Sequence, residues 1–178
     1  VEAEVVLSEQ LILNAGAWYA TESGDDFTEF AGFVDLRWDL NKDFTIGTSL
    51  TYHDFDQSLL RDGIDTGLFA TYYATDDLDF TIGAYHDFGN DAWYAKAEAG
   101  GSKPVGADSY VGLSGGVSWV DDFVGRSGMN DFYGRASYTY NVNSAVSLTP
   151  FVGWSVMFDG SDQNGDEFFG GLWFEVVF

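Results

Sequence analysis

Residues 168–178 read FFGGLWFEVVF, and the spacing of apolar residues in this stretch decides the fold. Successive side chains of a β-strand point to opposite faces, so every second residue shares a face. One face is apolar throughout and holds Phe168, Gly170, Leu172, Phe174, Val176 and Phe178; the other includes the charged Glu175. A period of two predicts a β-strand that is apolar on one side.

The same alternation recurs in nine further segments. They span residues 11–19, 30–40, 44–53, 65–75, 80–87, 93–100, 110–119, 132–142 and 146–158. None of the ten apolar faces carries Asp, Glu, Lys or Arg, whereas the opposite faces carry Asp35, Arg37, Asp39, Asp65, Lys96, Glu98, Arg135 and Glu175. A tilted strand crosses a bilayer in about 9–11 residues, and most of these segments reach that length.

The composition excludes several classes of protein. The formal net charge of −22, from 7 Lys+Arg against 29 Asp+Glu, argues against nucleic-acid binding, which needs basic contacts to phosphate. Cys is absent, so disulfide frameworks and thiolate metal sites are excluded. The length of 178 residues suits one domain, and no run of 18 apolar residues predicts a transmembrane helix.

Connections between the segments alternate in length. Residues 41–43, 76–78 and 143–145 predict short turns and 102–108 a somewhat longer one, whereas 54–64, 120–131 and 159–167 predict long loops. With ten strands, both termini are expected on the short-turn side. Residues 1–10 are expected to lead into the first strand, and they lack the basic start and apolar core of a signal peptide, as in a mature exported chain.

The alternating strand that ends in Phe178 resembles the closing strand of small Gram-negative outer-membrane β-barrel proteins, and the length pattern of the loops is similar to theirs. The resemblance implies a cell outer-membrane location. It also implies contacts with membrane lipid and lipopolysaccharide, and recognition by the barrel assembly machinery through Phe174, Val176 and Phe178. Protein partners beyond that machinery are not indicated.

The expected fold is all-β: a single closed, antiparallel, up-and-down transmembrane barrel of about ten strands over residues 1–178. Its apolar face points outward and both termini are periplasmic. A soluble lipocalin-type barrel would turn its apolar face inward. Uncharged apolar faces, and aromatic residues near the predicted strand ends, favour the membrane arrangement.

Two functions are open for the charged inner face. Its five acids and three bases fill the interior as ion pairs, or they line a narrow pore with a slight cation preference. The leading hypothesis is therefore a non-enzymatic pore or structural component of the outer membrane. A soluble barrel that binds an apolar ligand is an alternative.

A rim-site hydrolase is another alternative. Omptin proteases use rim Asp and His residues, and lipid-modifying barrels use a His on a similar scaffold. The thin likeness here is carried by His53-Asp54 and His86-Asp87. The segment at 43–47 recurs 36 residues later at 79–83, whereas His53 and His86 are only 33 residues apart. They therefore fall on opposite faces unless a bulge intervenes.

Acidic residues gather in windows 20–29, 54–65, 87–92, 120–131 and 159–167, where they form a repulsive outer surface or bind divalent cations. The last window resembles a calcium loop through Asp159, Asp162, Asn164 and Asp166. It departs from the EF-hand pattern in its Gly position and lacks the closing Glu, so an Asn-Gly hairpin explains it equally well. No other cofactor is expected.

Overall fold

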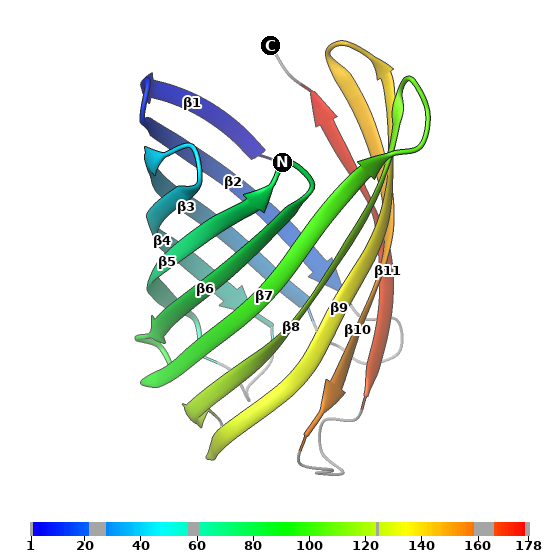
Figure 1. The fold of residues 1–178 in the computed structure, drawn as a ribbon. Helices are drawn as coiled ribbons and strands as arrows, with labels where there is room; N and C mark the ends of the chain where they lie inside the picture. The colour runs from blue at the N-terminus through cyan, green and yellow to red at the C-terminus, as the bar shows by residue number, and fades with distance from the viewer. Residues whose placement is uncertain (1, 22–27, 57–60, 124, 159–165, 177–178) are drawn as a thin grey trace.

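The computed structural model describes residues 2–21, 28–56, 61–123, 125–158 and 166–176. These residues form a single antiparallel sheet of eleven strands, shown in Figure 1. The strands are β1 (Glu2–Ser8), β2 (Leu11–Thr21), β3 (Thr28–Asn41), β4 (Phe44–Phe55), β5 (Gly63–Thr75), β6 (Leu78–Asp87), β7 (Ala92–Pro104), β8 (Ser109–Phe123), β9 (Arg126–Asn143), β10 (Val146–Met157) and β11 (Glu167–Val176). In this described part, no helix is long and apolar enough to cross a membrane.

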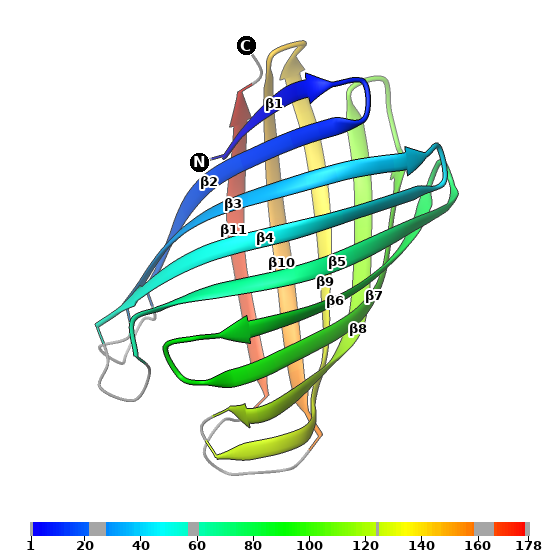
Figure 2. The same cartoon turned by 90° about the vertical axis from the view of Figure 1, so that its left-hand side faces the viewer.

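Strand order in the sheet follows chain order, so each strand pairs with its sequence neighbour. The sheet curls into a barrel-like shell whose edge strands are β1 and β11, as the two views in Figures 1 and 2 show. An all-β, up-and-down antiparallel sheet is thus confirmed. Among the described residues, no strand pairing joins β11 to β1 or β2. The pairing observed here therefore does not close the sheet into a ring.

The first strand corrects the sequence prediction. Residues expected to be a lead-in form β1, which pairs with residues 11–16 of β2, for example Val5 with Leu13. The sheet therefore has eleven strands instead of ten. The segment was missed because Val5-Val6-Leu7 is a continuous apolar run without a period of two.

The positions of the termini follow from the odd strand count. Val176 pairs with Val146, next to a short turn, as expected for the C-terminal end. Glu2 lies opposite Gly16, partway along β2, and not at the short-turn edge. The expectation of both termini on one side was wrong for the N-terminal end because one more strand precedes β2.

Short turns gather at one end of the sheet, here named the turn end, and the remaining connections gather at the other, the loop end. Four turns share one type of hydrogen bond, in which a side-chain oxygen accepts from the backbone N–H two residues on; in the first of them Ser8 accepts from Gln10 at 3.4 Å. Asn41 accepts from Asp43 at 2.8 Å, Thr75 from Asp77 at 3.2 Å and Asn143 from Ala145 at 2.8 Å. Such Asx- and ST-turns reverse the chain tightly.

The hairpin of β8 and β9 is longer than expected. Residues 120–131 were predicted to be a long loop, but strand pairing continues to Phe123 and resumes at Arg126. Two irregularities, near Val117–Trp119 and Val120–Phe123, let the ladder run on, with Asp122 at a positive φ of 57°. Such bulges bend a hairpin without ending it, and an alternation-based prediction stops where they begin.

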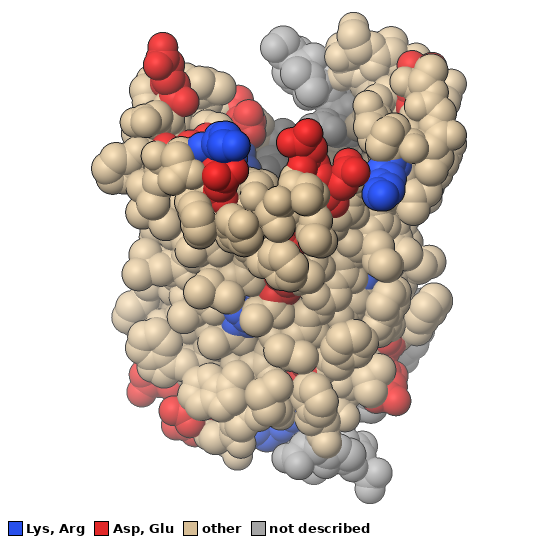
Figure 3. All heavy atoms as spheres, viewed as in Figure 1, with Lys and Arg blue, Asp and Glu red and all other residues tan. Residues whose placement is uncertain are grey.

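Apolar residues of the alternating faces point outward. Leu68 is 70% exposed, Ile82 63% and Leu113 61%, and Figure 3 shows a largely uncharged band between two charged ends. The opposite faces point into the shell, where Asn14, Ser49, Ser118 and Asp131 are buried. The expected orientation, apolar outside and polar inside, is what the strands adopt.

Candidate functional site

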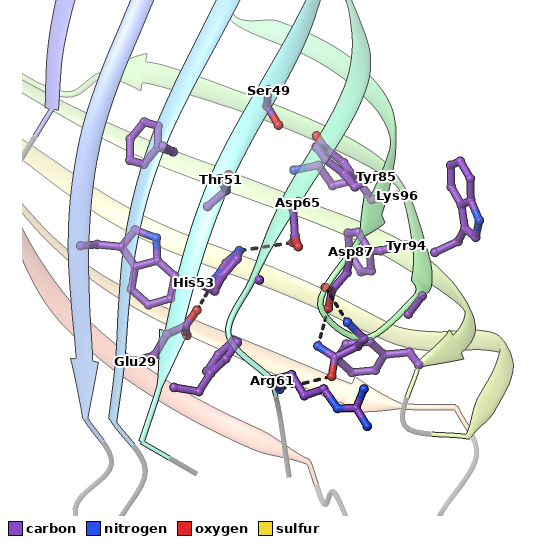
Figure 4. Close-up of a pocket in the computed structure, with 18 of the residues that line it drawn as sticks. Glu29, Ser49, Thr51, His53, Arg61, Asp65, Tyr85, Asp87, Tyr94 and Lys96 are labelled. Carbon is purple, nitrogen blue, oxygen red and sulfur yellow. Dashed lines mark hydrogen bonds and ion pairs between the residues drawn. The ribbon is translucent and has the colours of Figure 1, made fainter. Parts of the chain in front are cut away.

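A cavity of about 570 Å³ opens on the inner face at the loop end, formed by the strands from β2 to β8. Figure 4 shows its side chains. Its walls combine aromatic rings with charged groups. The rings are Trp18, Phe33, Phe55, Phe69, Tyr85, Trp93, Tyr94 and Phe123, the acids are Glu29, Asp35, Asp65 and Asp87, and the bases are His53, Arg61 and Lys96.

His53 lies between two carboxylates from neighbouring strands. Its Nδ1 is 2.6 Å from Oε1 of Glu29 on β3, and its Nε2 is 3.2 Å from Oδ2 of Asp65 on β5. All three side chains are mostly buried. Ionised carboxylates only accept hydrogen bonds, so this arrangement fits an imidazolium in which both ring N–H groups donate.

Asp87 orders the wall beside this triad. One carboxylate oxygen accepts from the backbone N–H groups of Gly89 at 2.7 Å and Asn90 at 3.0 Å, and the other from the Asn90 amide at 2.6 Å. The Asn90 side-chain oxygen in turn accepts from the backbone N–H of Arg61 at 3.3 Å. Two loop-end connections, one before β5 and one before β7, are thereby fixed to each other.

Aromatic rings of the inner face lie flat against glycines on neighbouring strands. A Cβ built on Gly67 would overlap the ring of Tyr85, and one built on Gly47 would overlap that of Phe69. Because glycine has no side chain, these rings settle against the wall and leave the space beside them open. The Lys96 ammonium lies 5.8 Å from the Tyr85 ring centroid, within cation–π range.

A second polar cluster lies on β8, β9 and β10. The buried carboxylate of Asp131 accepts hydrogen bonds from the hydroxyls of Ser118 and Ser155, the latter at 2.6 Å, and from the Asn130 amide at 3.2 Å. The Asn130 amide also donates to Ser118 at 3.1 Å. With four hydrogen bonds among its own members, this cluster joins three strands and holds Asp131 as a structural group.

Of the inner-face charges predicted from sequence, the structure brings Asp35, Asp65 and Lys96 together in the pocket. The others lie apart from it. Arg37 forms a 2.7 Å ion pair with Glu4 of β1, and Asp39 accepts from the Thr45 hydroxyl at 2.5 Å near the turn end. The Arg135 guanidinium lies 4.0 Å from the Phe151 ring centroid, and Glu98 pairs across the sheet with Thr81 and Gly116.

The remaining predicted residues belong to β11, directly precede it, or lie outside the described residues. Glu175 pairs with Ser147 and Val176 with Val146 in the ladder, and Phe174 is exposed on the outer face. Asp159, Asp162, Asn164 and Phe178 fall outside the described residues. Asp166 accepts from the backbone N–H of Met157 at 3.3 Å. Within the described ranges no group of three or more His, Cys, Asp and Glu is placed to hold a metal ion.

The two His-Asp pairs do not form one site. His86 lies on the outer face against Phe88 and Trp93, with ring centroids 4.5 Å and 4.7 Å away, and its Nε2 is 3.5 Å from Asp91. His53 faces inward. No bulge lies in the ladder of β6 with β7, so the spacing difference keeps the two residues on opposite faces. The partners of His53 are Glu29 and Asp65, not the neighbouring Asp54.

Sequence reasoning missed Glu29, Arg61, Asp87 and Asn90 as pocket residues. Glu29 and Asp87 were grouped with the solvated acidic loops, although each lies on the inward parity of its strand. Extending the alternation of 30–40 back by one residue would have found Glu29.

No family model matches this sequence, and the search of curated proteins found no match.

Proposed function

We propose that this chain is an integral β-barrel protein of a Gram-negative outer membrane, non-enzymatic, which acts as a narrow pore or a structural component. The observation that carries this proposal is the outward direction of the uncharged apolar faces. Leu68, Ile82, Leu113 and Leu172 are each more than 60% exposed near the middle of four different strands. Soluble monomers rarely expose apolar patches of more than a few hundred Å², whereas hydrocarbon tails favour such a surface.

The arrangement of the inner face supports the membrane proposal over a soluble barrel. A lipocalin-type barrel stores an apolar ligand inside and places its charges in water. Here Asp35 and Lys96 line an inner cavity, while Val152 and Phe174 are exposed outside. Aromatic residues also stand at both ends of the exposed band, with Trp38, Phe44 and Phe80 toward the turn end and Tyr52, Trp93 and Trp119 toward the loop end. Outer-membrane barrels have similar aromatic girdles.

Membrane insertion requires that the free edge of β11 be paired, because hydrocarbon cannot satisfy backbone N–H and C=O groups. Consecutive pairs are all antiparallel, so β1 runs parallel to β11 and β2 runs antiparallel to it. β1 pairs with residues 11–16 of β2, and β2 extends beyond that ladder to Thr21. In this proposal β11 closes the barrel against the last residues of β2, beyond Ala17, with the outer leaflet lipid and lipopolysaccharide around it.

A narrow pore with a slight cation preference fits the inner surface. The rings of Phe69 and Tyr85 lie against Gly47 and Gly67 in the wall of the shell. Among the described residues at the loop end, eight exposed acids outnumber two bases, Arg61 and Arg126; the acids are Asp54, Asp56, Asp62, Asp91, Asp121, Asp122, Asp166 and Glu167. Such a mouth raises the local concentration of cations and repels anions.

Two measurements test this proposal. The protein should require detergent for extraction from membranes and should migrate differently on gels before and after boiling, since a closed barrel resists unfolding by detergent at room temperature. In planar bilayers with a KCl gradient, a pore should give a reversal potential of the cation-preferring sign. A protein that stays in solution without detergent would overturn the membrane location. A protein with heat-modifiable gel mobility but no conductance would exclude the pore and support the structural role.

A further inference from the structure

We propose that the loop-end pocket binds a small organic cation that carries its charge on an aromatic or apolar body. This inference goes beyond a pore, because it assigns a ligand class to one cavity. It also does not depend on membrane insertion, since the cavity lies between strands of the described sheet.

The shape of the pocket suits a ligand of this size. Its volume of about 570 Å³ lies within the roughly 300–1,000 Å³ typical of small-molecule sites. The rings of Trp18, Phe33 and Phe69 provide apolar wall, and Tyr85 and Tyr94 contact each other at a ring-centroid distance of 6.0 Å. A lone metal ion is compact and has no apolar surface to place against these walls, whereas an organic body packs against them.

The charges of the pocket select a cation. Four carboxylates line it, against two permanently charged bases, and His53 is already shared between Glu29 and Asp65. The pocket thus keeps a net negative charge even with His53 protonated. The acidic loop end outside it has the same sign, so an approaching cation is attracted and an anion repelled.

Two cationic side chains of the protein already make the kind of contact that we expect for the bound organic cation. The Lys96 ammonium lies over the Tyr85 ring at 5.8 Å, and the His53 ring stacks on Phe55 at 5.6 Å with an interplanar angle of 1°. Cation–π contact with an aromatic face, together with a nearby carboxylate, is the usual way proteins hold quaternary and primary ammonium groups. Asp35 lines the pocket beside these rings, and so does Asp65, whose Oδ2 contacts His53; these are the carboxylates that we assign to the ligand's charge.

The test compares three probes of similar size on the purified full chain in detergent: benzyltrimethylammonium, benzyl alcohol and benzoate. Isothermal titration calorimetry or equilibrium dialysis gives each Kd. We expect the ammonium probe to bind at least tenfold more tightly than either of the others. Benzoate or benzyl alcohol binding as tightly as the cation would overturn the proposal.

Variants locate the binding. Asp35→Asn and Asp65→Asn should each weaken ammonium binding about tenfold, and Tyr85→Leu should weaken it at unchanged charge. Asp79→Asn is the matched control, because Asp79 is an inner-face acid of β6 near the turn end, beside Gly100 and away from the pocket. Equal losses in Asp79→Asn and Asp65→Asn would reduce the effect to general electrostatics and overturn the site. Gel mobility confirms folding of each variant, and if Asp65→Asn does not fold, Asp35→Asn and Tyr85→Leu decide.

Failure of this site and failure of the pore proposal are distinguishable. Ligand binding is measured in detergent and conductance in a bilayer, so either result stands without the other. Cation binding without conductance would support a binding barrel with a closed lumen.

Discussion

Glu29 and His53 are joined across the β3–β4 pair by a contact of 2.6 Å between Oε1 and Nδ1, although 24 residues separate them in the chain. They are not directly opposite in the ladder, since Glu29 pairs with Phe55 and His53 with Ala31. Residues two positions apart on paired strands share a face, so the long Glu side chain reaches the imidazole diagonally. This diagonal pair, with Asp65 beyond it, ties three strands together at the mouth of the shell.

Removal of His53 should destabilise the loop end. In His53→Ala the carboxylates of Glu29 and Asp65 lose the cation between them and face each other in a mostly buried site. Hydrogen bonds to charged groups contribute about 1.5–3 kcal/mol each to stability, so a loss in this range is expected. The midpoint of urea unfolding measures it. His86→Ala, on the outer face, is the control, and an equal effect there would contradict the assigned role of the triad.

A lysine introduced on the outer face should block membrane insertion, whereas a lysine introduced on the inner face should not. Ile82→Lys places an ammonium on the exposed band near the middle of β6, which costs about 2–4 kcal/mol at a bilayer midplane. Thr51→Lys places the same group in the acid-lined pocket. Folding yield into liposomes should fall for Ile82→Lys and stay near the parent value for Thr51→Lys. Equal yields would contradict the lipid-facing assignment.

Closure of the barrel can be trapped with disulfides. The chain has no Cys, so any disulfide that forms must join the two introduced cysteines. Tyr19→Cys on β2, combined in turn with Phe168→Cys, Gly170→Cys or Leu172→Cys on β11, should cross-link in membranes for at least one pair, because bonding requires Cα atoms within about 7 Å. Gel mobility under non-reducing conditions detects the cross-link. If no pair forms while the adjacent-strand pair Val5→Cys with Leu13→Cys does, closure through β2 is wrong.

Filling the space at an inner glycine should narrow the lumen. In Gly67→Ala the new Cβ would overlap the Tyr85 ring, which must rotate away from the wall toward the open space. Single-channel conductance and affinity for the ammonium probe should both fall severalfold. Gly32→Ala is the control, because its Cβ would lie 4.0 Å from the carbonyl oxygen of Gly16 and disturbs nothing. Unchanged conductance in Gly67→Ala would show that this ring does not border the conducting path.

Local signals predicted most of the strands. The alternation around Ile82 and Leu113 placed these residues on the outer face, and the structure confirms that placement. The different spacing of His53 and His86 likewise put them on opposite faces, as observed. These predictions succeed because the direction of a side chain from a strand depends only on local backbone stereochemistry.

Strand ends were harder to predict. The segment 93–100 extends as β7 to Pro104, through Gly100, Gly101 and Ser102, residues with little β-propensity of their own. They remain in the sheet because β6 and β8 pair with this stretch. Pairing on both sides overrides local preference, and only the assembled sheet contains that information.

The sequence by itself determined the strands and which of their faces is apolar, because both follow from a period of two in a single chain segment. Only the tertiary structure decided that Glu29 reaches His53, that residues 2–8 add a strand beside β2, and that Asp35, Asp65 and Lys96 share one cavity. These relationships depend on the register, tilt and curvature of many paired strands. Such quantities arise from the sum of contacts across the sheet, so no single segment encodes them.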